Sequence, residues 1–168
     1  MCVTETELFH GAVLAKIMRG KPDALRLVER DSVERAVYLV EGLPGTPEPS
    51  SFYVKYSCTP QRRRDGSAVW AFTFSAAHLR QIREAQERGR TFLTLVCGNR
   101  NIKDKHLAME LAVVWPDEID MVLDTASIEG ASIRVEKGAG RRRLRVHGRA
   151  SEPLLVKKAR MEQLVGTA

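Results

Sequence analysis

The sequence predicts a single-domain α+β protein with a mixed central sheet flanked by helices. Three observations support this class: an amphipathic stretch opens the chain, short strands rich in aromatic and β-branched residues recur after it, and the run 91–97 is apolar without polar alternation. Such a run is typical of a central strand that is covered on both faces. At 168 residues, with 43% hydrophobic residues, the chain is long enough for one substantial core.

The first element is predicted to be a helix over residues 4–19. Thr4 and Glu7 have the spacing of a capping box, in which each side chain bonds the other residue's backbone N–H. Apolar residues follow at intervals of four, and Gly20 and Pro22 end the pattern.

Residues 24–30 and 35–41 are predicted to be strands joined by a turn at Asp31 and Ser32. The segment 42–51 holds three prolines and two glycines, which predicts a loop. The next strand, 52–57, contains one lysine.

Alternation places Lys55 on the same face of that strand as Tyr53 and Ser57. The lysine is then either a solvated strand residue or one arm of a charged site. The pattern leaves both interpretations open.

The middle of the chain continues as a loop, a strand, a helix and the apolar strand. The polar loop 58–68 carries Arg62, Arg63 and Arg64, and the strand 69–74 follows it. Ser75 is predicted to cap a helix that Gly89 stops.

The second half is predicted to be a strand-rich extension, 99–168, of a core formed by residues 4–98. It contains a strand at 107–115, a helix that begins at Pro116, a hairpin formed by 132–137 and 142–147, and a short strand and helix at the end. In the hairpin, alternation points Arg143, Arg145 and His147 outward together.

Positive charge is concentrated in the middle of the chain. Residues 51–105 hold 11 basic and 4 acidic side chains, which gives +7, whereas the whole chain carries +6. A second arginine cluster spans 141–149. Clustered arginine suits a polyanionic partner, because its planar guanidinium forms bidentate bonds with phosphate. A basic surface that serves only solubility is the alternative.

The order of elements over residues 4–97 resembles the core of the PD-(D/E)XK nucleases, the restriction-endonuclease-like fold. In that family a helix glutamate, a strand aspartate and an acid-x-lysine pair hold a divalent metal and orient the attacking water. The resemblance implies roles for Glu7, Glu41 and Lys55, but Tyr53 stands where the acid of the pair is expected. Each residue also has a structural alternative: Glu7 as a helix cap, Glu41 as the polar end of a strand, and Lys55 as a solvated residue.

A second resemblance involves Lys55-Tyr56-Ser57, residues 70–74 and residues 95–98, which are similar to segments of small bacterial proteins without an assigned activity. It implies no chemistry.

The sequence gives little support for a histidine metal site, a membrane-spanning helix or a disulfide framework. The four histidines lack metal-ligand spacing, and no apolar run approaches the roughly 20 residues of a membrane helix. The three cysteines have no framework spacing, which favours free thiols in the cytoplasm. We expect no membrane association and no cofactor, with magnesium or manganese only if the nuclease interpretation holds.

The sequence therefore favours a protein that binds the phosphate backbone of DNA or RNA through Arg62, Arg63, Arg64, Arg143 and Arg145, with Lys55 as a further contact and a degenerate nuclease-like core. Tyr53, Tyr56 and Trp70 are candidates for base stacking, although core packing is the alternative and is favoured for Trp70. A non-catalytic adaptor or accessory subunit that meets an acidic protein is the alternative function.

Overall fold

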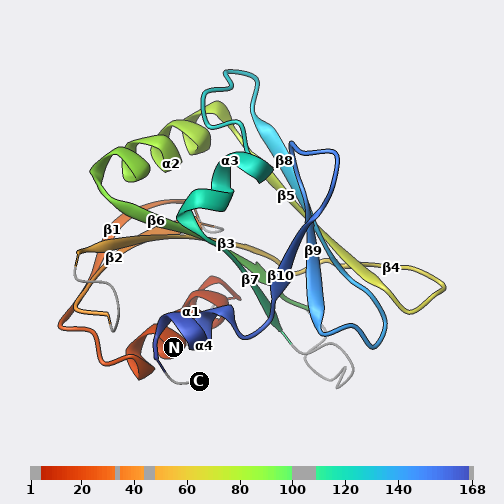
Figure 1. Cartoon of the computed structure of the whole chain (residues 1–168), viewed down its shortest axis with the longest axis horizontal. Helices are drawn as coiled ribbons and strands as arrows, with labels where there is room; N and C mark the ends of the chain where they lie inside the picture. The colour runs from red at the N-terminus through yellow and green to blue at the C-terminus, as the bar shows by residue number, and fades with distance from the viewer. Residues whose placement is uncertain (1–4, 33–34, 44–47, 100–108, 167–168) are drawn as a thin grey trace.

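The protein is an α+β structure, and within its described residues ten strands form two five-stranded sheets (Figure 1). The computed structural model describes residues 5–32, 35–43, 48–99 and 109–166. Sheet A has the order β1 (Ala24–Ser32), β2 (Arg35–Glu41), β3 (Ser50–Ser57), β6 (Arg90–Cys97), β7 (Glu110–Val114). Sheet B has the order β10 (Leu154–Lys157), β9 (Arg143–His147), β8 (Ala131–Lys137), β5 (Ala68–Phe74), β4 (Gln61–Arg62). The helices are α1 (Glu5–Arg19), α2 (Ala76–Arg88), α3 (Ile119–Val122), which a 3₁₀ turn at Pro116–Glu118 precedes, and α4 (Arg160–Leu164).

Sheet A is mixed, as the sequence predicts. Strands β1, β2 and β3 form an antiparallel meander, and β7 is antiparallel to β6. Strand β6 is parallel to β3, because the chain leaves sheet A for β4 and β5 and returns through α2. The predicted α+β class is confirmed, but the division of the strands between two sheets was not foreseen.

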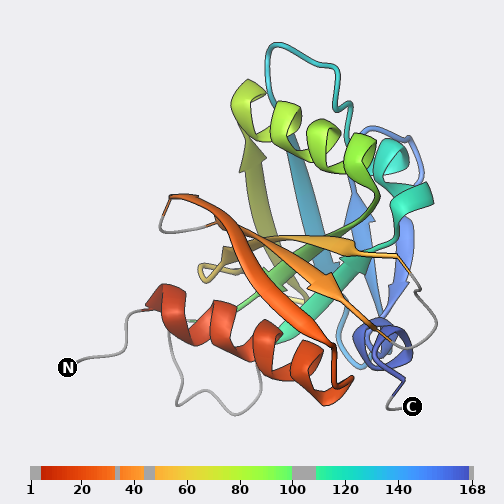
Figure 2. The ribbon, with the colours of Figure 1, turned by 90° about the vertical axis from the view of Figure 1, so that its left-hand side faces the viewer.

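Helices α1 and α4 cover one face of sheet A, while α2 lies beyond its other face (Figure 2). The predicted apolar stripe of α1, Phe9, Val13 and Ile17, is buried on this face against residues that include Phe52 and Val54 of β3. At about 25 cal/mol per Å² of apolar surface, this burial stabilises α1 far more than its intrinsic helix propensity does.

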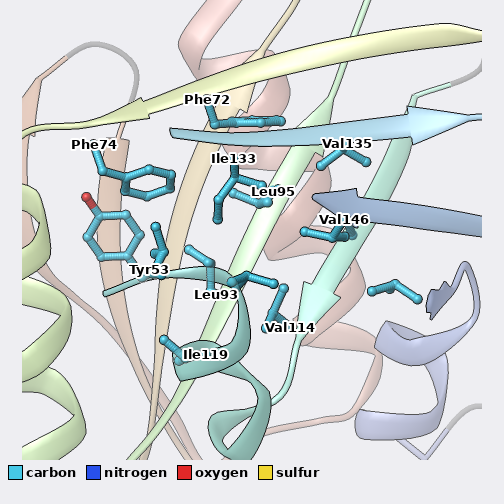
Figure 3. Close-up of a cluster of buried hydrophobic side chains, with 14 of the residues drawn as sticks. Tyr53, Phe72, Phe74, Leu93, Leu95, Val114, Ile119, Ile133, Val135 and Val146 are labelled. Carbon is cyan, nitrogen blue, oxygen red and sulfur yellow. The ribbon is translucent and has the colours of Figure 1, made fainter. Parts of the chain in front are cut away.

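The opposite face of sheet A packs against sheet B, and Figure 3 shows the side chains between them. Tyr53, Leu93 and Leu95 of sheet A meet Phe72 and Val135 of sheet B. Helices α2 and α3 close this second core with further buried apolar residues, Leu79, Ile82, Ile119 and Val122. Because this core draws on both 4–98 and 99–168, the two segments share one hydrophobic interior.

Three predicted boundaries are wrong. Asp31 and Ser32 continue β1 where a turn was predicted, and β3 begins at Ser50, inside the predicted loop 42–51. The polar loop 58–68 contains β4, which pairs with the start of β5. The arginine run is therefore part of a tight hairpin, because Gly66 adopts a φ of +79° that lets the chain reverse within a few residues.

Candidate nucleic-acid interface

The β4–β5 hairpin presents three consecutive arginines at one end of sheet B. The amide N–H of Arg63 donates to the Ser67 carbonyl at 2.9 Å, which closes the turn. The Asp65 carboxylate accepts from the Ser67 hydroxyl at 2.7 Å and from the Ser67 amide at 2.9 Å. The hydroxyl bond is the main reason that the pKa of Asp65 lies below its usual value of 3.8, so Asp65 stays ionised and holds the loop together.

The β8–β9 hairpin supplies the second arginine cluster at the same end of the sheet. Its turn closes with a bond from the Arg141 amide to the Gly138 carbonyl at 3.1 Å, and Gly140 has a φ of +66°. The tip between the strands consists of the small residues Gly138, Ala139 and Gly140. Lys137 and Arg141 therefore flank this tip, and Ala139 and Gly140 within it are exposed.

The two hairpins lie side by side because β5 and β8 are paired neighbours, with Ala68 opposite Lys137 (Figure 1). Their tips touch: a Cβ placed on Gly66 would lie 3.4 Å from the Cβ of Ala139. Two arginine clusters that are about 80 positions apart in the chain thus form one surface, as antiparallel pairing dictates.

Two grooves follow the joined tips. Basic residues of both hairpins line one groove, and basic residues of the β8–β9 hairpin line the other. The larger groove, of about 780 Å³, is lined by residues that include Arg62, Arg63, Arg64, Lys137, Arg141 and Lys158. The second, of about 620 Å³, lies against the outer face of sheet B, and its lining includes Asp65, Glu136, Arg141, Arg142, Arg143 and Arg145. Arg141 is common to both, so the two grooves are continuous parts of one basic end, which we call the arginine end.

Some charges at the arginine end are balanced and others are not. Glu136 lies 3.8 Å from Arg63 and 3.4 Å from His147, and Glu110 pairs with both Lys137 and Lys158. Of the described arginines that line the two grooves, five exposed ones form no ion pair: Arg64, Arg141, Arg142, Arg143 and Arg145. Their guanidinium groups are open to an anionic ligand.

The outer face of sheet B extends this charge beyond the hairpin tips. The prediction that Arg143, Arg145 and His147 point outward is confirmed, since Leu144 and Val146 between them are buried. In register, Arg143 lies opposite Lys157, and His147 lies opposite Arg134. The sequence analysis did not identify Arg134 and Lys157 as candidates, because neither lies in a run of basic residues. Only the strand register places them beside the arginine cluster.

Lys55 lies in the core between the two sheets. Only 4% of its surface is exposed, and its ammonium nitrogen lies 5.7 Å from the centre of the Phe74 ring. The interpretation as a solvated residue is wrong, because sheet B covers the face that Lys55 shares with Tyr53. Lys55 also does not line either groove.

The three residues of the nuclease interpretation do not converge. Arg35 is the register partner of Lys55 on β2, and Glu41 stands six residues further along, about 20 Å away. Glu41 pairs instead with Arg26 at 2.8 Å. Glu7 is exposed on α1, which covers the other face of sheet A.

No group of three or more histidine, cysteine, aspartate or glutamate residues that could hold a metal occurs within the described ranges.

Cys97 is fully buried, and this burial, reinforced by Glu110, raises the pKa of its thiol well above 9.0. A buried thiol with a raised pKa is a poor nucleophile. Thr4, the predicted partner of Glu7 in the capping box, lies outside the described residues.

Tyr53, Tyr56 and Trp70 are buried, with at most 8% of their surface exposed, so their interpretation as base-stacking residues is wrong.

Among the described residues, no helix has the length and apolar character to cross a membrane. Comparison with known proteins finds no matching family model, no similar curated protein and no similar solved structure.

Proposed function

We propose that this protein binds nucleic acid by its phosphate backbone and that the arginine end is the contact surface. The convergence of Arg62–Arg64 with Arg141–Arg145 carries the proposal, because it gathers cations that the sequence keeps apart. Five of these arginines have no ion pair among the described residues, so binding phosphate would not require an existing pair to break. Arginine suits this role because two of its N–H groups can bond one phosphate.

The proposal includes a degenerate nuclease-like core that does not cleave. Its support is the order of α1, β1, β2, β3, α2 and β6, which is similar to the element order of the PD-(D/E)XK resemblance once β4 and β5, which stand between β3 and α2, are set aside. Tyr53 in place of a carboxylate and the distance of Glu41 from Lys55 argue against an intact metal site. Binding in the absence of divalent metal, without cleavage when magnesium or manganese is added, is the expected behaviour.

A charge-reversal pair tests the contact surface. Arg141→Glu with Arg143→Glu should weaken binding to labelled DNA or RNA at least tenfold at low salt, measured by fluorescence anisotropy. The matched control is Arg80→Glu with Arg83→Glu on α2, which changes net charge equally at two exposed positions outside both grooves. Equal losses in both variants would mean that net charge alone drives binding, and no affinity for any nucleic acid at low salt would end the proposal.

An adaptor that meets an acidic protein would use the same charges. The two functions differ in their response to nuclease: a stoichiometric protein complex that survives nuclease treatment and is lost in the Arg141/Arg143 variant would favour the adaptor.

A further inference from the structure

We infer that the nucleic acid bound at the arginine end is double-stranded. This inference rests on the proposed function and concerns which form of nucleic acid the surface accepts. Three observations on the described residues carry it: no phenylalanine, tyrosine or tryptophan lines either groove, small exposed residues form the hairpin tips, and arginines line the grooves on two sides of those tips.

Among the described residues, no phenylalanine, tyrosine or tryptophan lines either groove of the arginine end. It has five phenylalanines, three tyrosines and two tryptophans, and all ten lie in the described part of the chain. Nine of them are buried, with at most 8% of their surface exposed. The tenth, Trp115, is half-buried and packs edge-on against Phe92 at 5.9 Å.

Proteins that bind single strands usually combine a basic groove with exposed aromatic rings, because unstacked bases need a new stacking partner. Each such contact contributes about 1–3 kcal/mol. The arginine end has the groove without the rings. A duplex keeps its own bases stacked, so a surface that offers only cations loses little when it binds one.

The shape of the arginine end also suits a duplex. Gly66, Ala139 and Gly140 at the two touching tips are exposed and small, so the backbone there can approach a partner closely. Arginines stand on both sides of the tips, with Arg64 lining one groove and Arg143 and Arg145 lining the other. A duplex presents two phosphate strands beside a groove, and cations on both sides of a projection can reach both strands.

The spacing on the outer face of sheet B agrees with contact to an extended array of phosphates. Arg143 and Arg145 lie two residues apart on β9, about 7 Å along the strand, and Lys157 lies opposite Arg143 on β10, about 5 Å across. These positions form a two-dimensional grid of positive charge. A row of phosphates along a nucleic-acid backbone can contact several of these cations at once.

The test compares one labelled DNA duplex with each of its two component strands, at equal length and salt, by fluorescence anisotropy. We expect the duplex to bind at least tenfold more tightly than either strand. Tryptophan emission should stay unchanged on binding, because Trp70 is buried and Trp115 packs against Phe92. The Arg141→Glu/Arg143→Glu pair should lose duplex binding, while the Arg80→Glu/Arg83→Glu pair keeps it.

Single strands that bind as tightly as the duplex, still dependent on Arg141 and Arg143, would overturn this inference and leave the proposed function standing. Quenching of tryptophan emission by a bound single strand would overturn it as well. Loss of binding to every form of nucleic acid would remove the proposed function together with the inference.

Discussion

The Lys137 ammonium of sheet B lies 2.6 Å from the Glu110 carboxylate of sheet A, at the edge of the larger groove. Lys158 donates to the same carboxylate oxygen at 2.9 Å. Glu110 therefore fixes β7 against β8 and against the segment that follows β10. It also neutralises two lysines that would otherwise add to the positive charge of the arginine end.

Glu110→Gln should change stability and binding in opposite directions. The free energy of unfolding should fall by about 1–2 kcal/mol, because both ion pairs are half-buried and lose their anion. Affinity for nucleic acid should rise severalfold, because two lysines beside the groove become available to phosphate. Urea unfolding and anisotropy measure the two effects.

The control for this change is Glu129→Gln, which alters net charge equally at an exposed loop position that lines neither groove. It should leave both quantities nearly unchanged. A fall in affinity for Glu110→Gln would contradict the assignment of the arginine end, since added positive charge at a true contact surface cannot repel phosphate.

The arginine end was partly predictable from the sequence because it depends on local rules. Period-two alternation was enough to turn Arg143 and Arg145 outward, and the tripeptide Arg62–Arg64 lies beside a turn residue, Gly66. The contact between the two hairpins was not predictable, since it requires β5 and β8 to be neighbours. No local pattern specifies which of several antiparallel strands will pair.

For Lys55, the local sequence pattern gave a wrong prediction of solvent exposure. Its strand has a lysine flanked by apolar residues, a pattern typical of one buried and one solvated face. The solvated face was expected because no local feature indicates that a second sheet will cover it. The side chain is instead enclosed by residues of sheet B, among them Phe74 at the end of β5.

A buried hydrogen bond between β5 and the residue that follows β6 gives a second prediction. The indole N–H of Trp70 donates to the Gly98 carbonyl at 2.7 Å in a fully buried position. Trp70→Phe removes this donor and part of the side-chain volume, so the free energy of unfolding should fall by about 2–4 kcal/mol in urea denaturation.

Thr73→Val is the control on the same strand, because Thr73 is exposed on the outer face and should tolerate the change within about 0.5 kcal/mol. If Trp70→Phe were equally harmless, the bond to Gly98 would have no part in holding the sheets together.

Acid should weaken the contact between α1 and α4. Burial raises the pKa of Glu162, but its hydrogen bond and ion pair with Lys16 outweigh that effect, and the pKa lies below the usual 4.5. A depressed carboxylate pKa adds stability that is present above about pH 4.5 and is lost as the pH falls through the lower folded value. Glu162→Gln should therefore be less stable than the native chain at pH 6, by less than about 1 kcal/mol, and this difference should shrink as the pH falls below 4.5.

Thermal unfolding at a series of pH values measures this difference. A gap between the two proteins that stays constant down to pH 3 would show that Glu162 acts through packing and not through its charge.

The dependence of binding on salt provides the most direct measure of how many arginines meet phosphate. If the five described groove-lining arginines without ion pairs all contact a duplex, the logarithm of the affinity should fall with the logarithm of salt concentration with a slope of about −4 to −5. Arg143→Gln should reduce that slope by about 0.9, while Arg83→Gln on α2 should leave it unchanged. Lys55→Met should leave it unchanged too, because Lys55 is buried between the sheets and reaches neither groove. A slope near zero, or one that responds to Lys55 and not to Arg143, would place the contact surface away from the arginine end.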